Sequence, residues 1–362
     1  MFDVPARLGR VRRQLATREL DALLVSQPEN RRYLSGFTGS AGYLLISAGQ
    51  AVLLSDFRYM TQAPQQAPDF EFVRLDRDFP RKTLPELAAR LGVQRLGFEA
   101  ADVSVALHER FAEALGDAGW RGDLVAAEGL VEELRAVKDD AELAVITEAV
   151  RIVDDAFASL VGTIKPGQSE REVAWTLEKL IRDEGAEGLS FATIIASGPN
   201  AAKPHHGLSD REIQKGEPIV CDFGARFEGY CSDITRTVCI GPGDGRFDEI
   251  YGLVLRAQLE AEQRIGPGIE ARMADQYARD VISAAGYGDQ FGHGLGHGVG
   301  LEVHEVPFVN TRDTTALAPA MALTVEPGIY LPGWGGVRIE DIGFVRQQGL
   351  EVINRASKTP NI

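Results

Sequence analysis

Two acidic residues interrupt a β-forming segment near the middle of the chain, and their placement restricts what the chain can fold into. The segment PIVCDFGARFEGYCSDITRT contains Asp222 and Asp233 among residues that favour strands. A turn centred on Phe227 and Glu228 places the two carboxylates directly opposite each other, about 5 Å apart, where bare charges repel. A solvated strand face would tolerate both acids, but most of their neighbours are apolar. We therefore expect a cationic group between them.

The same arrangement recurs near the C-terminus. In LTVEPGIYLPGWGGVRIEDIGF, Glu326 and Glu340 flank a turn rich in proline and glycine whose midpoint is Gly333. Strand alternation places Arg338 on the same face as Glu340. Two acid pairs on two β-ribbons predict one cavity lined by carboxylates.

Histidines add nitrogen ligands to these acids. Five of the six histidines lie between residues 205 and 304: His205, His206, His293, His297 and His304. The spacing of His293 and His297 resembles that of a helical metal-binding pair, but the surrounding glycines disfavour a helix and the HExxH order is absent. We expect these glycines to let the backbone approach a ligand closely.

The charge of this set indicates how many ions it can hold. Four carboxylates and one neutral imidazole nearly balance two divalent cations. Oxygen-rich ligands favour manganese or another hard ion, although zinc or cobalt can also bind. Two ions about 3.5 to 4 Å apart generate a nucleophilic hydroxide near neutral pH and polarise a carbonyl group.

The 362 residues divide by composition into two regions. Residues 1–130 alternate short apolar runs with helical patterns, which predicts an α/β domain. Residues 131–362 begin with apolar positions at three- and four-residue spacing and continue with helices, the two ribbons and a final run of strands. We expect an α+β domain there, entered through a linker helix.

Composition also excludes several classes of partner. A net charge of -15 without a basic patch argues against nucleic acid. The longest apolar runs are shorter than the about 18 residues of a membrane span, and the N-terminus predicts an amphipathic helix, not a signal peptide. We expect a cytoplasmic protein, in which the three cysteines are reduced thiols.

Five separated blocks carry a specific resemblance, which spans about residues 137 to 358. They are SGPNAAKPHHGLSDR, DFGARFEGYCSDITRT, GHGLGHGVGLEVHE, TVEPGIY and GVRIED. These blocks resemble the signatures of proline-specific metallopeptidases in the creatinase, prolidase and methionine aminopeptidase superfamily, whose catalytic fold is called pita-bread. The N-terminal region, with NRRYLSGFTGSAGYLLI, resembles the creatinase-type domain of bacterial Xaa-Pro aminopeptidases.

The resemblance implies a role for each matching residue. The ligands of two metal ions would be Asp222, Asp233, His297, Glu326 and Glu340. Glu326 would also carry a proton from the attacking water to the proline nitrogen, which leaves poorly unless it is protonated.

Three further histidines and one arginine complete the implied site. His205, His293 and His304 match substrate-binding histidines that position or polarise the peptide. Arg338 would orient Glu340 or a neighbouring acid, or contact the substrate itself. The family pattern reads PHG where this chain reads PHHG, and the spacing to Asp222 favours His205 over His206.

The expected reaction is release of the N-terminal residue from peptides with proline in second place. Some prolidases have an arginine that anchors the dipeptide carboxylate where this chain has Phe308, which favours the aminopeptidase. A prolidase is the alternative, in which an arginine of the ENRRY loop, from this or another subunit, replaces that anchor. A non-catalytic peptide-binding relative is a third reading, which the complete ligand set disfavours. The family implies a homodimer or homotetramer.

Overall fold

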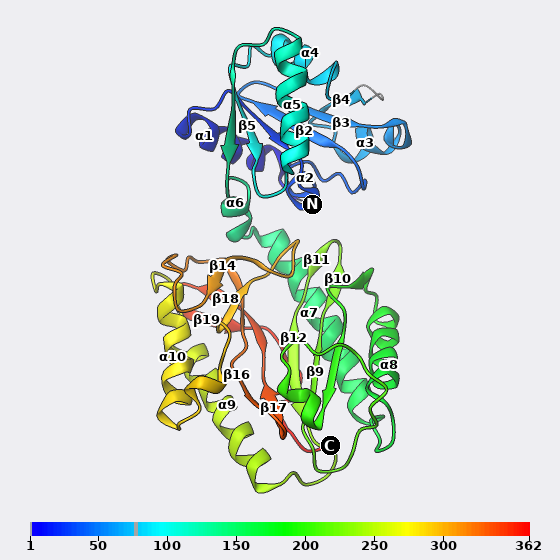
Figure 1. Ribbon diagram of the computed structural model, residues 1–362, viewed down its shortest axis with the longest axis vertical. Helices are drawn as coiled ribbons and strands as arrows, with labels where there is room; N and C mark the ends of the chain where they lie inside the picture. Colours follow the sequence, from blue (N-terminus) through cyan, green and yellow to red (C-terminus); the bar gives the residue numbers. More distant parts are fainter. Residues whose placement is uncertain (1, 76–78) are drawn as a thin grey trace. The chain divides into compact units, whose positions relative to one another are not determined.

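The computed structural model describes residues 2–75 and 79–362 (Figure 1). The chain divides into two compact units, residues 1–135 and residues 136–362, where the sequence predicted a boundary near residue 130. Each unit has its own sheets and its own core, and each is described by itself.

The N-terminal unit contains one six-stranded mixed sheet with the order β4-β3-β2-β1-β5-β6. Its strands are β1 (Ala22–Val25), β2 (Tyr43–Ser47), β3 (Ala51–Ser55), β4 (Glu71–Arg74), β5 (Arg95–Glu99) and β6 (Asp123–Ala127). Its helices are α1 (Val4–Thr17), α2 (Pro28–Ser35), the 3₁₀ turn η1 (Phe57–Tyr59), α3 (Gln62–Gln66), α4 (Thr83–Arg90) and α5 (Val105–Asp117). Strands β1 and β3 are buried along their whole length, as expected of apolar runs covered on both faces. This is the predicted α/β domain.

The long helical pattern that follows is broken in the structure. It forms a short helix α6 (Glu132–Ala136) and a long helix α7 (Asp140–Val161). Asp139 and Glu142 form a capping box that starts α7, because the Asp139 side chain satisfies a backbone N–H of the first turn and Glu142 satisfies that of Asp139.

The C-terminal unit packs helices against small antiparallel sheets. Its further helices are α8 (Glu170–Asp183), η2 (Gly198–Ala202), α9 (Gly245–Arg264), α10 (Ala271–Ala284) and η3 (Gly288–Gln290). Its first strands are β7 (Gly188–Leu189), β8 (Ile194–Ser197), β9 (Ile219–Phe223), β10 (Ala225–Phe227), β11 (Tyr230–Cys231) and β12 (Ile234–Val238). The remaining strands are β13 (Gly296–Gly298), β14 (Glu305–Val309), β15 (Ala322–Val325), β16 (Gly328–Leu331), β17 (Gly335–Arg338), β18 (Asp341–Arg346) and β19 (Gly349–Val352).

Two hydrophobic cores pack helices against the strands of this unit. Figure 1 shows α7 and α8 beside β9 and β12, and α9 and α10 beside the strands of the C-terminal sheets. One core joins α7 and α8 to β9 and β12, and the other joins α9 and α10 to β15 through β18. The strand faces turned away from these cores are available for polar side chains. Among the described residues, no helix combines the length and apolar content that a bilayer crossing requires.

Candidate functional site

The first ribbon carries Asp222 and Asp233 close together, but not opposite each other. Strands β9 and β12 pair so that Thr235 lies opposite Asp222. The chain turns at Glu228 and Gly229, which both have positive φ, 44° and 81°, as a two-residue hairpin turn requires. The predicted turn was centred one residue too early, so the direct pairing of the two aspartates is wrong. They are diagonal neighbours, still within reach of one cation.

The second ribbon keeps the predicted register. Residues 322–325 of β15 pair with residues 341–344 of β18, and residues 328–331 of β16 pair with residues 335–338 of β17, all around a turn at Gly333. Glu326 follows β15 and Glu340 precedes β18, so both glutamates lie where one strand pair ends and the next begins. The turn centre at Gly333 is confirmed.

The two ribbons and β13 bring all five predicted ligands together. Ligand atoms of Asp222, Asp233 and Glu340 lie within 4.8 Å of one another, as do those of His297, Glu326 and Glu340. The Nε2 atom of His297, on β13, is 3.2 Å from Glu326 Oε1 and 3.7 Å from Asp233 Oδ2. A third such group consists of Asp233, His297 and His304. Asp233, His297 and Glu340 therefore each belong to two of the three groups.

The glycines around His297 leave room for neighbouring backbone. A Cβ atom on Gly296 would lie 2.1 Å from the carbonyl oxygen of Thr324, and one on Gly298 would lie 2.4 Å from that of Val306. These glycines therefore allow neighbouring backbone to lie close to the segment. The close approach lets the Thr324 hydroxyl accept from the His297 N–H at 3.1 Å. Gly296 also lines the cavity that the acids line, and the close approach of a ligand stays a prediction.

Burial opposes ionisation of this cluster. Burial, reinforced by neighbouring carboxylates, raises the pKa of Asp222 and raises those of Asp233 and Glu340 well above the usual range. Burial acts in the same direction on Glu326, but the hydrogen bond and charge of His297 outweigh it and lower the pKa of Glu326 to about 2. The surroundings therefore lack positive charge relative to the acids they hold.

Two carboxylate oxygens indicate what is needed to complete the cluster. Within the described residues, Asp233 Oδ1 and Glu340 Oε1 are buried without a hydrogen-bond partner, an arrangement that is costly unless a cation is bound. His297 Nδ1 lies 3.1 Å from the Gly298 carbonyl oxygen; donation there would allow Nε2 to release the proton that it shares with Glu326 and to bind a cation instead. The residues present therefore fit a pair of divalent ions.

A buried arginine and a threonine hold the acids in place. Arg338 Nη2 donates to Asp222 Oδ2 at 2.5 Å, and Arg338 Nε donates to Thr235 Oγ1 at 3.0 Å. The Thr235 hydroxyl in turn donates to Glu340 Oε2 at 2.7 Å. Arg338 thus contacts Asp222 directly and Glu340 only through Thr235, where the sequence left open which acid it orients.

The acids open into a cavity of about 470 Å³. Besides the ligands, the cavity is lined by His205, His293 and His304, by Arg338, and by Phe191, Phe308 and Asn310. The His304 ring lies 4.3 Å from that of His297, centroid to centroid. All the histidines predicted to contact substrate therefore face the same space as the acids.

The His293 ring is held at both nitrogens. Nδ1 lies 2.7 Å from the Gly294 carbonyl oxygen, and Nε2 lies 2.9 Å from the Tyr330 hydroxyl. That hydroxyl also accepts from Arg338 Nη1 at 2.8 Å, so its own proton points to Nε2. Burial lowers the pKa of His293, which keeps the ring neutral. The imidazole therefore has one defined tautomer.

Sequence reasoning missed Thr235 and Tyr330. Strand alternation offered a signal for both, because Thr235 shares a face with Asp233 and Tyr330 lies four residues beyond Glu326. The adjacent histidines also separate in space. His206 Nε2 lies 2.9 Å from Glu170 Oε2, whereas His205 lines the cavity.

Models of known protein families match both units of the chain. The model of metallopeptidase family M24 matches residues 144–347, and the creatinase/prolidase N-terminal domain matches residues 7–137. Similar solved structures include prolidases, whose catalytic domain has the pita-bread fold, and the fold class expected from the sequence is therefore confirmed.

Three relatives cover nearly the whole chain. A Xaa-Pro dipeptidase from Pyrococcus horikoshii is 37% identical over 94% of both chains. The structure of a Xaa-Pro dipeptidase from Bacillus anthracis is 41% identical with a TM-score of 0.96, covering 99% of this chain and 100% of that one. An X-Pro aminopeptidase structure from Thermotoga maritima is 38% identical with a TM-score of 0.88, covering 98% of this chain and 100% of that one.

Proposed function

The chain belongs to metallopeptidase family M24, and from that premise we propose that it is a metal-dependent dipeptidase that cleaves Xaa-Pro. The observation that carries the proposal is the convergence of four carboxylates and one imidazole at the base of a cavity lined by three more histidines. An enzyme of this class needs both parts, because the acids hold metal and the histidines contact the peptide.

The residues that would hold two divalent ions are Asp222, Asp233, His297, Glu326 and Glu340. When bound, the ions supply Lewis-acid polarisation of the scissile carbonyl and lower the pKa of a water molecule. The predominance of oxygen ligands supports manganese as the ion, with zinc or cobalt as alternatives.

Glu326 is the proposed proton carrier. Its carboxylate lines the cavity beside the other acids, where it can accept a proton from the attacking water. Passing that proton to the proline nitrogen of the tertiary amide allows proline to leave as an amine. Thr324 Oγ1 donates to Glu326 Oε1 at 3.2 Å and restricts the carboxylate to this orientation.

The histidines divide into two groups in this proposal. We assign hydrogen bonds with the peptide to His205 and His304, which line the cavity. Both ring nitrogens of His293 are used by Gly294 and Tyr330. We therefore propose that the His293 ring forms a wall of the cavity against which the substrate packs, in place of the polarising role expected from the sequence. Arg338 donates to four protein groups, which supports an orienting role over a substrate contact.

The relatives favour the dipeptidase over the aminopeptidase expected from the sequence. Proteins named Xaa-Pro dipeptidase match this chain over nearly its full length, so Phe308 at the anchor position is weaker evidence than the sequence suggested. The aminopeptidase stays a second candidate, because Phe308 lines the cavity with 44% of its surface exposed and offers no charge to a dipeptide carboxylate.

One comparison separates the two activities. The manganese-loaded protein is assayed with a Xaa-Pro dipeptide and the matching Xaa-Pro-Xaa tripeptide, and kcat/KM is measured for each. We expect faster cleavage of the dipeptide. Faster cleavage of the tripeptide would assign the aminopeptidase instead, and cleavage of neither would reject both activities. The homodimer or homotetramer expected from the sequence stays a prediction, to be measured by light scattering.

A further inference from the structure

Glu170, at the start of α8, is a buried carboxylate that the proposed reaction does not use. It is fully buried, with 0% of its surface exposed, and it is not among the residues that line the cavity. Helix capping does not account for it. Ser169 and Glu172 form the capping box of α8, with the Ser169 hydroxyl accepting from the Glu172 N–H at 3.2 Å. The Glu170 side chain therefore serves another purpose.

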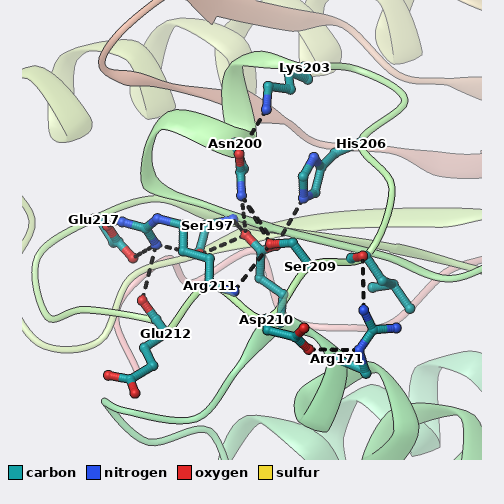
Figure 2. Close-up of polar contacts among 12 residues, drawn as sticks. Arg171, Ser197, Asn200, Lys203, His206, Ser209, Asp210, Arg211, Glu212 and Glu217 are labelled. Carbon is teal, nitrogen blue, oxygen red and sulfur yellow. Dashed lines mark hydrogen bonds and ion pairs between the residues drawn. The ribbon is translucent and has the colours of Figure 1, made fainter.

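Four residues of one segment direct donors at this carboxylate. Figure 2 shows Ser197, Asn200, His206 and Ser209 converging on a common centre. Glu170 Oε1 accepts from the Ser197 N–H at 2.8 Å, the Ser197 hydroxyl at 2.9 Å and the Asn200 amide at 3.0 Å. Glu170 Oε2 lies 2.9 Å from His206 Nε2 and accepts from the Ser209 hydroxyl at 2.5 Å. One side chain therefore collects donors from both ends of residues 197–209.

The donors are themselves oriented for this contact. Lys203 Nζ donates to Asn200 Oδ1 at 2.9 Å, which turns the Asn200 NH₂ group towards Glu170. Arg211 Nη1 donates to the Ser197 hydroxyl oxygen at 2.6 Å, so the Ser197 proton is directed at Glu170. Burial raises the pKa of Glu170, but its hydrogen bonds outweigh burial and lower it. The acceptor is thus ionised, which makes each bond charge-assisted.

The residues between these donors carry His205. Residues 203–208, all of them described, belong to no helix or strand, so the segment depends on side-chain contacts for a fixed shape. His206 joins the Glu170 cluster, and the preceding residue, His205, lines the cavity. The chain is thus held immediately beside the histidine that faces the cavity. On the cavity side, Arg338 Nη1 donates to the Pro204 carbonyl oxygen at 3.3 Å.

We propose that Glu170 is a positioning residue that fixes residues 197–209 and thereby holds His205 at the substrate. The inference deepens the proposed function and rests on it, because His205 matters only if a peptide binds in the cavity. Glu170 touches neither substrate nor metal. Its effect on catalysis passes through the conformation of the segment and the place of one imidazole ring.

The main test is the Glu170→Gln variant. Glutamine keeps the size but turns one acceptor oxygen into a donor, which then faces either Ser197 and Asn200 or His206 and Ser209. We expect kcat/KM for a Xaa-Pro dipeptide to fall about 10- to 100-fold, with bound metal unchanged. The matched control is Asp154→Asn, because Asp154 is a buried carboxylate of the same unit that accepts from Asn354 and the Arg355 N–H. It holds a different segment, and its loss leaves kcat/KM within about twofold.

A double-mutant cycle separates positioning from general destabilisation. His205→Ala lowers kcat/KM by itself, and Glu170→Gln in that background should lower it little further, because both changes remove the same contact. Full additivity of the two losses would overturn the proposal. So would a Glu170→Gln variant that retains the kcat/KM of the natural sequence.

Hydrogen exchange provides a readout that needs no catalysis. We expect backbone amides of residues 198–208 to exchange faster in Glu170→Gln, while α9 and α10 keep their protection. Unchanged exchange in the segment would overturn the proposal. If the unsubstituted protein cleaves no Xaa-Pro peptide, the proposed function fails, and the exchange measurement still decides whether Glu170 orders the segment.

Discussion

Thr235 on β12 donates a hydrogen bond of 2.7 Å to Glu340, which lies between β17 and β18. The same hydroxyl accepts from Arg338 Nε at 3.0 Å, and Thr235 lies opposite Asp222 across the first ribbon. A single hydroxyl therefore connects the two ribbons that bear the acids. Its direction leaves Glu340 Oε1 without a hydrogen-bond partner among the described residues, which is the oxygen that a metal ion would take.

Substitution of Thr235 by valine should weaken metal binding. Valine has nearly the same shape but cannot donate to Glu340, so the carboxylate loses its fixed orientation. We expect the affinity for manganese to fall about 10- to 100-fold, measured by isothermal titration calorimetry. The matched control is Thr237→Val on the same strand, because the Thr237 hydroxyl bonds the backbone of Arg338 and no acid. An equal loss of affinity in both variants would contradict the assignment.

Removal of metal should abolish cleavage and lower the thermal stability. We expect about two manganese ions per chain, measured by atomic emission after dialysis, and a melting temperature that rises when manganese is added to chelator-treated protein, as for any ligand that binds only the folded state. Asp233→Asn should reduce the number of bound ions, because its Oδ1 lacks another partner within the described chain. Full metal content in that variant would refute its role as a ligand.

Gly336 should not tolerate a methyl group. A Cβ atom there would lie 2.2 Å from the carbonyl oxygen of Ala201 in η2, so Gly336→Ala pushes away the backbone that leads to His205. We expect a loss of about 1 to 3 kcal/mol in the free energy of unfolding, as for other overpacked sites, together with a lower kcat/KM. Gly245→Ala is the control, because a Cβ atom there meets nothing within 4 Å and should cost no stability.

The N-terminal unit should lose stability as the pH rises. Burial raises the pKa of Glu99 from 4.5 to about 7, although hydrogen bonds from Gln27, Asn30 and Ser26 oppose it. The folded state therefore holds this proton more tightly than the unfolded state. The resulting stability is fully present below pH 4.5 and is lost as the pH rises through about 7.

The size of this effect is measurable by denaturant unfolding. A shift of this direction and extent corresponds to roughly 3 kcal/mol in the free energy of unfolding. Urea titrations at several pH values measure this change. Glu99→Gln removes the titrating group and should flatten the dependence between pH 5 and pH 7. An equally steep dependence in the variant would assign the titration to other groups.

Local spacing was enough to predict much of this site. Glu326 and Glu340 are equidistant from Gly333, and the observed register agrees because the turn residues favour one centre and each strand has one buried face. The acids stood out because a buried strand rarely contains an unpaired carboxylate. The fold classes of the two units, α/β for the first and α+β for the second, followed from periodicity and from the resemblance.

Tertiary structure decided what no local pattern encodes. The turn at Glu228 and Gly229 lies one residue later than predicted, which shifts the pairing across the first ribbon by two residues, so that Asp222 faces Thr235 instead of Asp233. The bond from Thr235 to Glu340 joins residues 105 positions apart, and the donors around Glu170 come from the end of β8, from η2 and from the irregular residues that follow. The sequence alone determined which residues are acids, imidazoles and turn formers, because these depend on residue type and spacing. Which of them meet depended on the packing of distant strands, because hydrogen bonds act over only about 3 Å.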